Sequence, residues 1–399
     1  MRPVLKQGDP MALSRRAFVR SLGVGGAGAL STAWVVGRGH EALAWGPDPL
    51  EAALQAAPQQ DVIRISSNEN ARGPGDAALE AMREVIDGRV GRYGRDVVRV
   101  ALPEAIARRV GHGLTAENIL TTTGSGHILE ASVRAFVSPD RPLVNGAPSY
   151  SSPNRTAQTV GGSVRAVPLL PNLKLDLDGM AVAANGAGMV FLCNPNNPTA
   201  TGHALSDVAA FIRRVKSSSP DTAILVDEAY IEYATDTAIE TAAAQSLEYD
   251  DVFIARTFSK AYGMAGLRIG YAAGRPATLE KIASAWGLGE INMLTATGAV
   301  ASLNDPAHMD AEREENRRIR EFTINAFKEM GYEATDSQTN FLFVNIRRPA
   351  AEFRDAAREH GVIVGRDFPP MEQTHARISL GTMDEMQRAV EVFKRILET

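Results

Sequence analysis

The chain has 399 residues, of which 44% are hydrophobic and 22% are charged, and its formal net charge is −5. A length near 400 residues is typical of two domains, and the acidic balance argues against a nucleic-acid-binding surface. The single cysteine, Cys193, excludes an internal disulfide, and the seven histidines show no metal-ligand spacing, so we expect no metal site.

The first 44 residues have the pattern of a twin-arginine export signal. Arg15 and Arg16 lie in a Ser-Arg-Arg-Ala-Phe-Val-Arg run, a glycine-rich stretch follows at 21–37, and residues 42–44 form an A-x-A cleavage site. We expect residues 1–44 to direct the folded protein to the periplasm or another extracytoplasmic compartment, and the mature chain to begin at Trp45. The alternative is a disordered tail with two incidental arginines. The stretch is too short and too rich in glycine to predict a transmembrane helix.

Removal of such a signal would make the chain more acidic. It takes away six of the 42 basic residues and two of the 47 acidic residues, which leaves a net charge of −9. A basic nucleic-acid footprint is therefore not expected in the mature protein either.

Polar groups follow three apolar segments that have the composition of buried parallel strands. Residues 119–123 lead into Gly-Ser-Gly-His and then a helical pattern, which offers backbone N–H groups at a helix N-terminus to an anion. Residues 189–193 lead into Asn-Pro-Asn-Asn-Pro-Thr, and residues 223–226 lead into Asp-Glu-Ala-Tyr. Because open α/β sheets bind ligands at the carboxyl ends of their strands, we expect these groups to share one site. Any one of them alone could be a turn or a helix cap.

The middle of the chain also contains a loop with a lysine, two hydroxyls and an arginine. The apolar segment 252–255 precedes Thr257, Ser259, Lys260 and Arg268. A lysine amine can form a Schiff base with an aldehyde cofactor, and a nearby hydroxyl and guanidinium can hold the cofactor's phosphate. The loop is typical of pyridoxal-phosphate enzymes, although an isolated Ser-Lys pair would indicate only a surface lysine.

Two further segments complete the elements that we expect. Residues 310–330 predict a charged helix, whose Glu and Arg side chains favour a solvated face over a binding patch. Residues 340–344 predict a strand. Glu228 follows Asp227 directly, so an extended backbone points it the other way and favours a role as a cap or a surface group.

Three motifs follow one another in a specific order and spacing: N-x-N-N-P-T, D-E-A-Y, and S-K with an arginine eight residues after the lysine. The chain resembles the fold-type I, class I/II pyridoxal-phosphate-dependent aminotransferases, and within them the histidinol-phosphate aminotransferase group. The resemblance implies an α/β fold with an arm at 45–75, a large cofactor-binding domain at 76–305 with a mostly parallel seven-stranded sheet, and a smaller α/β domain at 306–399.

The resemblance also implies a role for each site residue. Three are catalytic: Lys260 binds the cofactor and later moves the substrate's proton, Asp227 pairs with the pyridine nitrogen, and Tyr230 bonds the ring hydroxyl. Asn197 is also expected at the ring hydroxyl, and Tyr150 is expected to stack on the ring. The residues expected to hold the phosphate are Ser125, Gly126, Thr257, Ser259 and Arg268. His127 is a further expected cofactor ligand, and Tyr93 would reach the phosphate of a neighbouring subunit's cofactor. Arg377 would bind the substrate's anionic end, and Asn68 lies in a segment expected to cover the site.

Two features depart from the family pattern. His127 stands where an acidic residue is usual, and Ala200-Thr201 separates Asn-Pro-Thr from the glycine that normally follows at once. Both departures concern the identity of the substrate more than the binding of the cofactor.

We expect an exported homodimeric enzyme that moves an amino group from an amino acid or a related amine to a 2-oxo acid. The alternatives are a histidinol-phosphate aminotransferase, a pyridoxal-phosphate-dependent decarboxylase or lyase and, more distantly, a binding protein without activity. Arg377 favours transamination because a guanidinium suits the substrate carboxylate. Export argues against histidinol phosphate, because histidine biosynthesis is cytoplasmic and a charged phosphate ester does not diffuse through lipid.

Overall fold

The computed structural model describes residues 62–398. The predicted export signal, the predicted mature terminus and the first part of the predicted arm lie outside the described residues. The division into a large and a small domain stays a prediction, and the two groups of sheets are described in turn.

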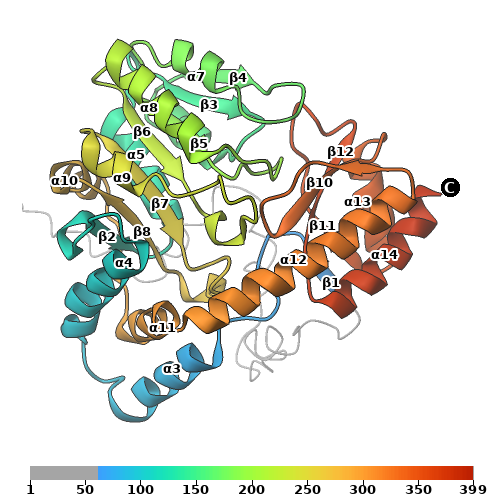
Figure 1. The fold of residues 1–399 in the computed structure, drawn as a ribbon, viewed down its shortest axis with the longest axis horizontal. Helices are drawn as coiled ribbons and strands as arrows, with labels where there is room; N and C mark the ends of the chain where they lie inside the picture. The colour runs from blue at the N-terminus through green and yellow to red at the C-terminus, as the bar shows by residue number, and fades with distance from the viewer. Residues whose placement is uncertain (1–61, 399) are drawn as a thin grey trace, which may run out of the picture. The chain divides into compact units, whose positions relative to one another are not determined.

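A seven-stranded sheet forms the centre of the first group, and its strands are ordered β2-β8-β7-β6-β5-β3-β4 (Figure 1). All neighbours pair in parallel except β8, which runs antiparallel to both β2 and β7. The predicted seven-stranded, mostly parallel sheet is therefore confirmed. Its strands are β2 (Ile119–Thr122), β3 (Leu143–Ala147), β4 (Val164–Pro168), β5 (Met189–Cys193), β6 (Ala223–Asp227), β7 (Val252–Thr257) and β8 (Gly270–Gly274).

Helices cover both faces of this sheet because the strand side chains alternate between two apolar clusters. In β5, Val190 and Leu192 belong to one cluster, whereas Met189, Phe191 and Cys193 belong to the other. The first cluster includes residues of α4 (Leu102–Val110), α7 (Leu177–Ala183), α8 (Leu205–Ser218), α9 (Ala243–Glu248) and α11 (Met293–Leu303). The second includes residues of α5 (Ser125–Phe136), α6 (Ser152–Thr159) and α10 (Pro276–Ala285).

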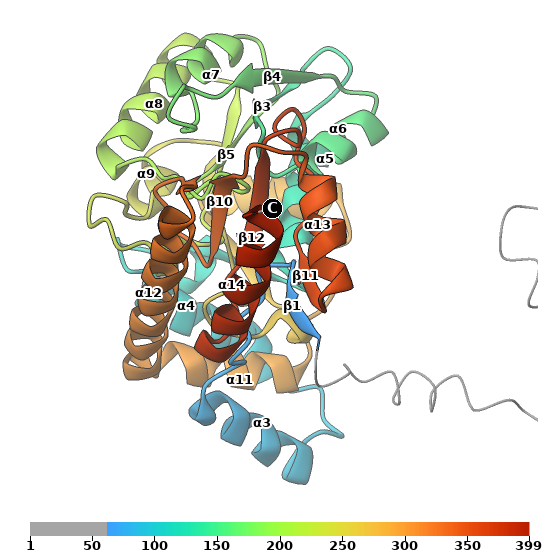
Figure 2. The same cartoon turned by 90° about the vertical axis from the view of Figure 1, so that its right-hand side faces the viewer.

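Two smaller sheets occupy the C-terminal part of the chain. Strand β10 (Phe341–Asn345) pairs antiparallel with β12 (His375–Ser379) and β9 (Glu333–Ala334). Strand β1 (Ile63–Ile65), from the predicted arm, pairs in parallel with β11 (Val362–Val364). Figure 2 shows β1 beside β11, with α13 (Ala350–Glu359) and α14 (Met383–Leu397) nearby. The arm thus contributes a strand to the C-terminal part.

The chain passes between the seven-stranded sheet and the smaller sheets in two places. The first is the segment 66–75, which leads from β1 to α3 (Asp76–Gly88). The second is the long helix α12 (Pro306–Glu329), which runs from α11 toward β10 (Figure 1). The short helices Val97–Ala101, Ala116–Asn118, Ile231–Tyr233 and Ala265–Leu267 connect the remaining elements.

Most charged side chains of α12 are exposed or partly exposed, in keeping with the expected solvated face, but two of them face inward. Glu312 and Arg320 are buried at 3% and 4% exposure, together with Asn316, whereas the exposed Glu314 pairs with the partly exposed Arg317. Positions four residues apart share one face of a helix, and this face packs inward. The buried charges have partners there: Arg320 donates to the carbonyl of Tyr233 at 3.3 Å, and Glu312 pairs with Arg72.

Candidate active site

A cavity of ≈ 670 Å³ lies at the carboxyl ends of β5, β6 and β7, as the strand-end pattern predicts. It brings together nearly all the predicted site residues. Those that line it are Asn68, Ser125, Gly126, Tyr150, Asn197, Asp227, Tyr230, Thr257, Ser259, Lys260, Arg268 and Arg377.

Asp227 ends β6 and supplies the carboxylate of the cavity. Its side chain is buried, and its Oδ1 has no hydrogen-bond partner among the described residues. Burial raises the pKa of Asp227 to about 7, because a charged carboxylate loses its hydration there. A buried carboxylate oxygen without a partner is costly unless a cationic group binds it, so the position suits a protonated ring nitrogen.

Glu228, the next residue, is not a surface group as its position led us to expect. It is 1% exposed, and its Oε2 accepts hydrogen bonds from Arg256 Nε and Thr241 Oγ1, both at 2.8 Å. Its Oε1 accepts from the backbone N–H of Ala242, the residue that precedes α9. Glu228 therefore caps a helix start from the interior and takes part in a buried ion pair.

Lys260 lies three residues after β7, and its amine points into the cavity. Its Nζ donates to the carbonyl of Ser67 at 3.1 Å, which is its only hydrogen bond among residues 62–398. Burial, followed by the positive charge of Arg377, lowers the pKa of Lys260 to about 8. A substantial fraction of the amine is therefore neutral near physiological pH, as a nucleophile or a proton acceptor requires.

The residues predicted to hold the phosphate lie at the N-terminus of α5. Gly124 precedes the helix with φ 92°, and an added Cβ would lie 2.3 Å from Arg268 Nη2, so the glycine lets the guanidinium approach the helix end. Arg268 Nη1 donates to Ser259 Oγ at 3.3 Å, and Ser259 N–H donates to Thr257 Oγ1 at 3.0 Å. Helix N–H groups, hydroxyls and a guanidinium form a cradle for a phosphate.

A hydrogen-bond network links the phenol of Tyr230 to Arg377. Tyr230 Oη accepts from Asn68 Nδ2 at 3.1 Å and from Asn197 Nδ2 at 3.3 Å. Arg377 Nη1 donates to Asn197 Oδ1 at 2.9 Å, and its Nη2 donates to the carbonyl of Ser66 at 2.6 Å. Arg377 Nε is buried without a partner among the described residues, so the guanidinium keeps an unused donor.

Three arginines that the sequence interpretation missed also line the cavity: Arg354, Arg358 and Arg366. The first two are four residues apart on α13 and so share one face. Arg366 follows β11 by two residues, so the strand-end rule could have found it if so short a strand had been recognised. The segment before Asn68 was also missed, because Ser66 and Ser67 contribute backbone carbonyls.

Two predicted cofactor residues lie elsewhere. His127 does not line the cavity, because its Nδ1 lies 2.7 Å from Thr123 Oγ1 and 3.1 Å from the carbonyl of Leu288. Its backbone N–H bonds the carbonyl of Gly124. Tyr93 is 86% exposed and lines a separate depression with residues 290–294. The unusual Ala200-Thr201 pair is buried and outside the cavity lining.

Comparison with known proteins now bears on this geometry. A family model for aminotransferase class I and II matches residues 60–393. The chain belongs to this family.

Individual relatives agree with the assignment. The chain is 34% identical over 356 residues to a histidinol-phosphate aminotransferase of Symbiobacterium thermophilum, covering 88% of this chain and 94% of the relative. It is 30% identical over 350 residues to that of Bacillus subtilis, covering 88% and 95%. The crystal structure of histidinol-phosphate aminotransferase from Sinorhizobium meliloti in complex with pyridoxal-5'-phosphate has a TM-score of 0.78 and 27% identity, covering 88% and 94%.

The protein is thus a pyridoxal-phosphate-dependent aminotransferase, and its cavity fits the cofactor. The unpaired Asp227 Oδ1 suits a pyridinium, the α5 cradle suits a phosphate, and Lys260 supplies an amine between them. Within the described part of the chain, no group of three or more His, Cys, Asp or Glu could hold a metal ion, and no helix is long and apolar enough to cross a membrane.

Proposed function

We propose that this aminotransferase takes the amino group from an amino acid or a related amine and transfers it to a 2-oxo acid. The observation that carries the proposal is that the Lys260 amine and the Arg377 guanidinium line the same cavity. The amine can act at the α-carbon while the guanidinium binds the carboxylate attached to that carbon.

The bound cofactor supplies an electron sink that delocalises the charge left when the substrate's α-proton is removed. We assign Asp227 to the ring nitrogen, where its carboxylate keeps that nitrogen protonated. We assign Asn197 and Tyr230 to the ring hydroxyl, and Tyr150 to the ring face. The phosphate is assigned to Ser125, Gly126, Thr257, Ser259 and Arg268, which line the cradle at α5.

Lys260 serves two purposes in this proposal. It would hold the cofactor covalently, and its free amine would move the proton from the substrate's α-carbon to the cofactor's own carbon. The carbonyl of Ser67, 3.1 Å away, orients the freed amine. A pKa of about 8 lets the same group act as a base and as an acid near neutral pH.

The cofactor residues alone would also serve a decarboxylase or a lyase. We favour transamination because Arg377, held by Asn197 and Ser66, can retain the substrate carboxylate through the reaction. A half-reaction screen tests this choice. Individual amino acids are mixed with the holoenzyme, and conversion of its visible absorption band to that of the pyridoxamine form is followed. Release of carbon dioxide without this conversion would contradict transamination.

Histidinol phosphate is a second candidate donor, and two observations favour it. The relatives in Symbiobacterium thermophilum and Bacillus subtilis bear that activity in their names, and Arg366 adds a guanidinium to the cavity that Arg377 lines. Arg354 and Arg358 line it too, but they are paired with Asp367 and Asp355. Against it stands the proposed export, which would separate the enzyme from a charged cytoplasmic ester. Specificity constants decide between the two donors. A value for histidinol phosphate far above those for amino acids, with rescue of a histidine auxotroph by signal-less protein, would overturn our choice.

We also propose that the enzyme is a homodimer in which Tyr93 reaches the neighbouring cofactor. Its support is the depression that Tyr93 and Val90 line together, in which the two side chains are 86% and 66% exposed. Mixing Lys260→Ala subunits with Tyr93→Phe subunits tests it, because each mixed dimer has one intact site. No recovery of activity in mixtures that exchange subunits would refute the shared site.

We finally propose that the protein leaves the cytoplasm folded, on the strength of the amino-terminal pattern. Replacing Arg15 and Arg16 together by lysine should retain the protein in the cytoplasm. The mature protein recovered outside should begin at Trp45. Unchanged fractionation of the double variant would remove the export proposal.

A further inference from the structure

The segment between β1 and α3 contacts the active site through its backbone. The carbonyl of Ser66 accepts from Arg377 Nη2 at 2.6 Å, and the carbonyl of Ser67 accepts from Lys260 Nζ at 3.1 Å. Both cationic groups of the proposed mechanism therefore depend on where this stretch of backbone lies.

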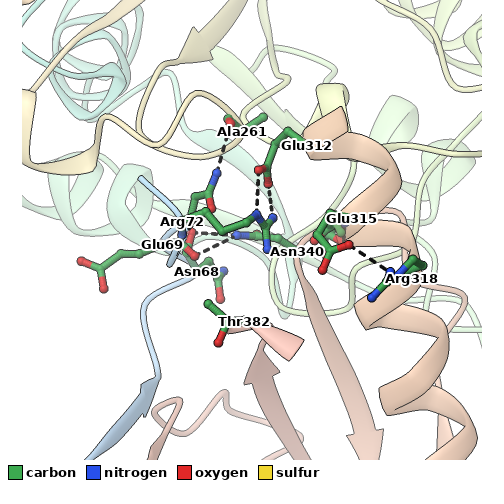
Figure 3. Close-up of polar contacts among 12 residues, drawn as sticks. Asn68, Glu69, Arg72, Ala261, Glu312, Glu315, Arg318, Asn340 and Thr382 are labelled. Carbon is green, nitrogen blue, oxygen red and sulfur yellow. Dashed lines mark hydrogen bonds and ion pairs between the residues drawn. The ribbon is translucent and has the colours of Figure 1, made fainter. Parts of the chain in front are cut away.

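The residues that follow these carbonyls in the same segment make further hydrogen bonds. Asn340 Nδ2 donates to the carbonyls of Asn68 and Glu69 at 3.1 and 3.3 Å, and Asn70 Nδ2 donates to the carbonyl of Ala261 at 3.3 Å (Figure 3). These are single neutral hydrogen bonds, each of modest strength.

One contact of the segment is a bidentate ion pair. Arg72 donates to both carboxylate oxygens of Glu312, and the Nε–Oε2 distance is 2.9 Å (Figure 3). The side chain of Glu312 is 2% exposed and that of Arg72 is 28% exposed. A buried carboxylate requires a cationic partner, so Glu312 holds Arg72 firmly in one position.

The pair joins the two places where the chain passes between the large sheet and the smaller sheets. Arg72 lies on the segment 66–75, and Glu312 lies in the second turn of α12. Next to the pair, the segment packs directly on the lysine loop: a Cβ added to Gly263 would lie 2.0 Å from the carbonyl oxygen of Gly73. A shift of the segment would therefore be transmitted to the loop that carries Lys260.

We propose that Arg72 and Glu312 are positioning residues, whose ion pair fixes the segment 66–73 and thereby the carbonyl that orients the Lys260 amine. The inference rests on the assignment of Lys260 as the cofactor lysine. Lys260 Nζ has no other hydrogen bond among residues 62–398, whereas Arg377 is also held by Asn197. Loss of the pair should therefore disturb proton transfer by Lys260 more than carboxylate binding by Arg377.

Four variants of the holoenzyme test the proposal. Glu312→Gln removes the negative charge of the pair. Arg72→Lys keeps the positive charge but cannot form the bidentate contact. Arg72→Met with Glu312→Leu replaces both ions by apolar groups of similar size, which avoids a buried lone charge if Glu312→Gln fails to fold. The control is Glu314→Gln, which removes an exposed ion pair with Arg317 from the same helix.

Two readouts separate the outcomes. Hydrogen exchange of the backbone amides at 66–73 should be at least about 10-fold faster in the apolar double variant than in the wild type and the control. Its kcat should fall at least about 10-fold while KM for the amino donor changes less than about threefold, because misplacement of a reacting group lowers the rate. Arg72→Lys should recover part of kcat.

A folded double variant with wild-type exchange at 66–73 would overturn the proposal, whatever the role of Lys260. Faster exchange with unchanged kcat would show that the pair is only structural, and equal changes in kcat and KM would contradict the selective link to Lys260. If cofactor mapping places the cofactor on a different lysine, the mechanism fails, while the exchange result still reports on the pair.

Discussion

The two walls of the active-site cavity are built in different ways. The wall that we assign to the cofactor uses residues at the ends of adjacent strands, such as Asp227, the last residue of β6, and Lys260, three residues after β7. The wall that we assign to the substrate joins distant parts of the chain: Ser66 meets Arg377, and Asn68 meets Ser379, each across 311 positions. The first wall follows from a parallel sheet, whereas the second exists only when both ends of the described chain come together.

The walls also differ in charge. On the cofactor wall, Oδ1 of the buried Asp227 has no hydrogen-bond partner among the described residues. The substrate wall carries Arg366 and Arg377, together with Arg354 and Arg358, which are paired with Asp367 and Asp355. Such an arrangement suits a cationic ring on one side and an anionic substrate on the other. Substitutions on the first wall should therefore affect the chemical step, and substitutions on the second should affect the choice of substrate.

The largest effect should come from Asp227→Asn on the cofactor wall. The variant should still bind the cofactor, because Lys260 and the phosphate cradle remain, but kcat should fall by about 100-fold or more because the ring nitrogen loses its counter-ion. Steady-state kinetics with the cofactor content measured by absorbance checks this. Near-normal turnover would refute the role of Asp227.

A second substitution tests the substrate wall. Arg377→Lys should raise KM for amino donors by about 10-fold or more with a smaller change in kcat, because a lysine cannot bind a carboxylate in the bidentate manner of a guanidinium. Arg366→Met sharpens the result. If it lowers kcat/KM for histidinol phosphate much more than for amino acids, Arg366 binds the substrate's phosphate. An equal loss of kcat/KM for both donors would contradict that role in specificity.

Most of the cofactor wall could be predicted from the sequence. An apolar run predicts where a strand ends, and the short motif that follows identifies the side chain at that end. Arg366 escaped this rule because β11 has only three residues. The Ser66 and Ser67 carbonyls escaped because backbone groups leave no signature in side-chain patterns. Glu312 resembles its exposed neighbours on α12 in sequence, and only tertiary packing distinguishes it.

The prediction for His127 shows a further limit. Its position right after Ser125 and Gly126 suggested a contact with the cofactor, but all three residues lie in the first turn of α5, where successive side chains point in different directions. The ring therefore turns toward Thr123 and Leu288 instead of the cavity. The last residue of a sequence motif can therefore point away from the site that the rest of the motif lines.

The pH dependence of cofactor capture tests the link between the walls. Capture by the apoprotein needs a neutral Lys260 amine, so its rate should rise with pH around the pKa of about 8. Because Arg377 is the next cause of the lowered pKa after burial, Arg377→Met should move the midpoint to higher pH. Stopped-flow absorbance measures both midpoints. An unchanged midpoint would contradict the electrostatic coupling of the two walls.

The smallest effect concerns stability without the cofactor. Because the pKa of Asp227 is raised to about 7, its ionisation destabilises the folded apoprotein progressively as pH rises from about 4 to about 7, and fully above that range. Apoprotein with Asp227→Asn should therefore melt about 2–5 °C above wild-type apoprotein at pH 8, with no such gain near pH 4. Calorimetry at the two pH values checks the sign; a gain confined to low pH would contradict it.

The identity of the lysine that binds the cofactor is the most direct test of the whole assignment. The purified holoenzyme is reduced with borohydride and digested, and the peptide that carries the added cofactor mass is sequenced by mass spectrometry. The account predicts that the mass lies on Lys260, between Ser259 and Ala261. The same mass on another lysine, with Lys260 unmodified, would contradict it.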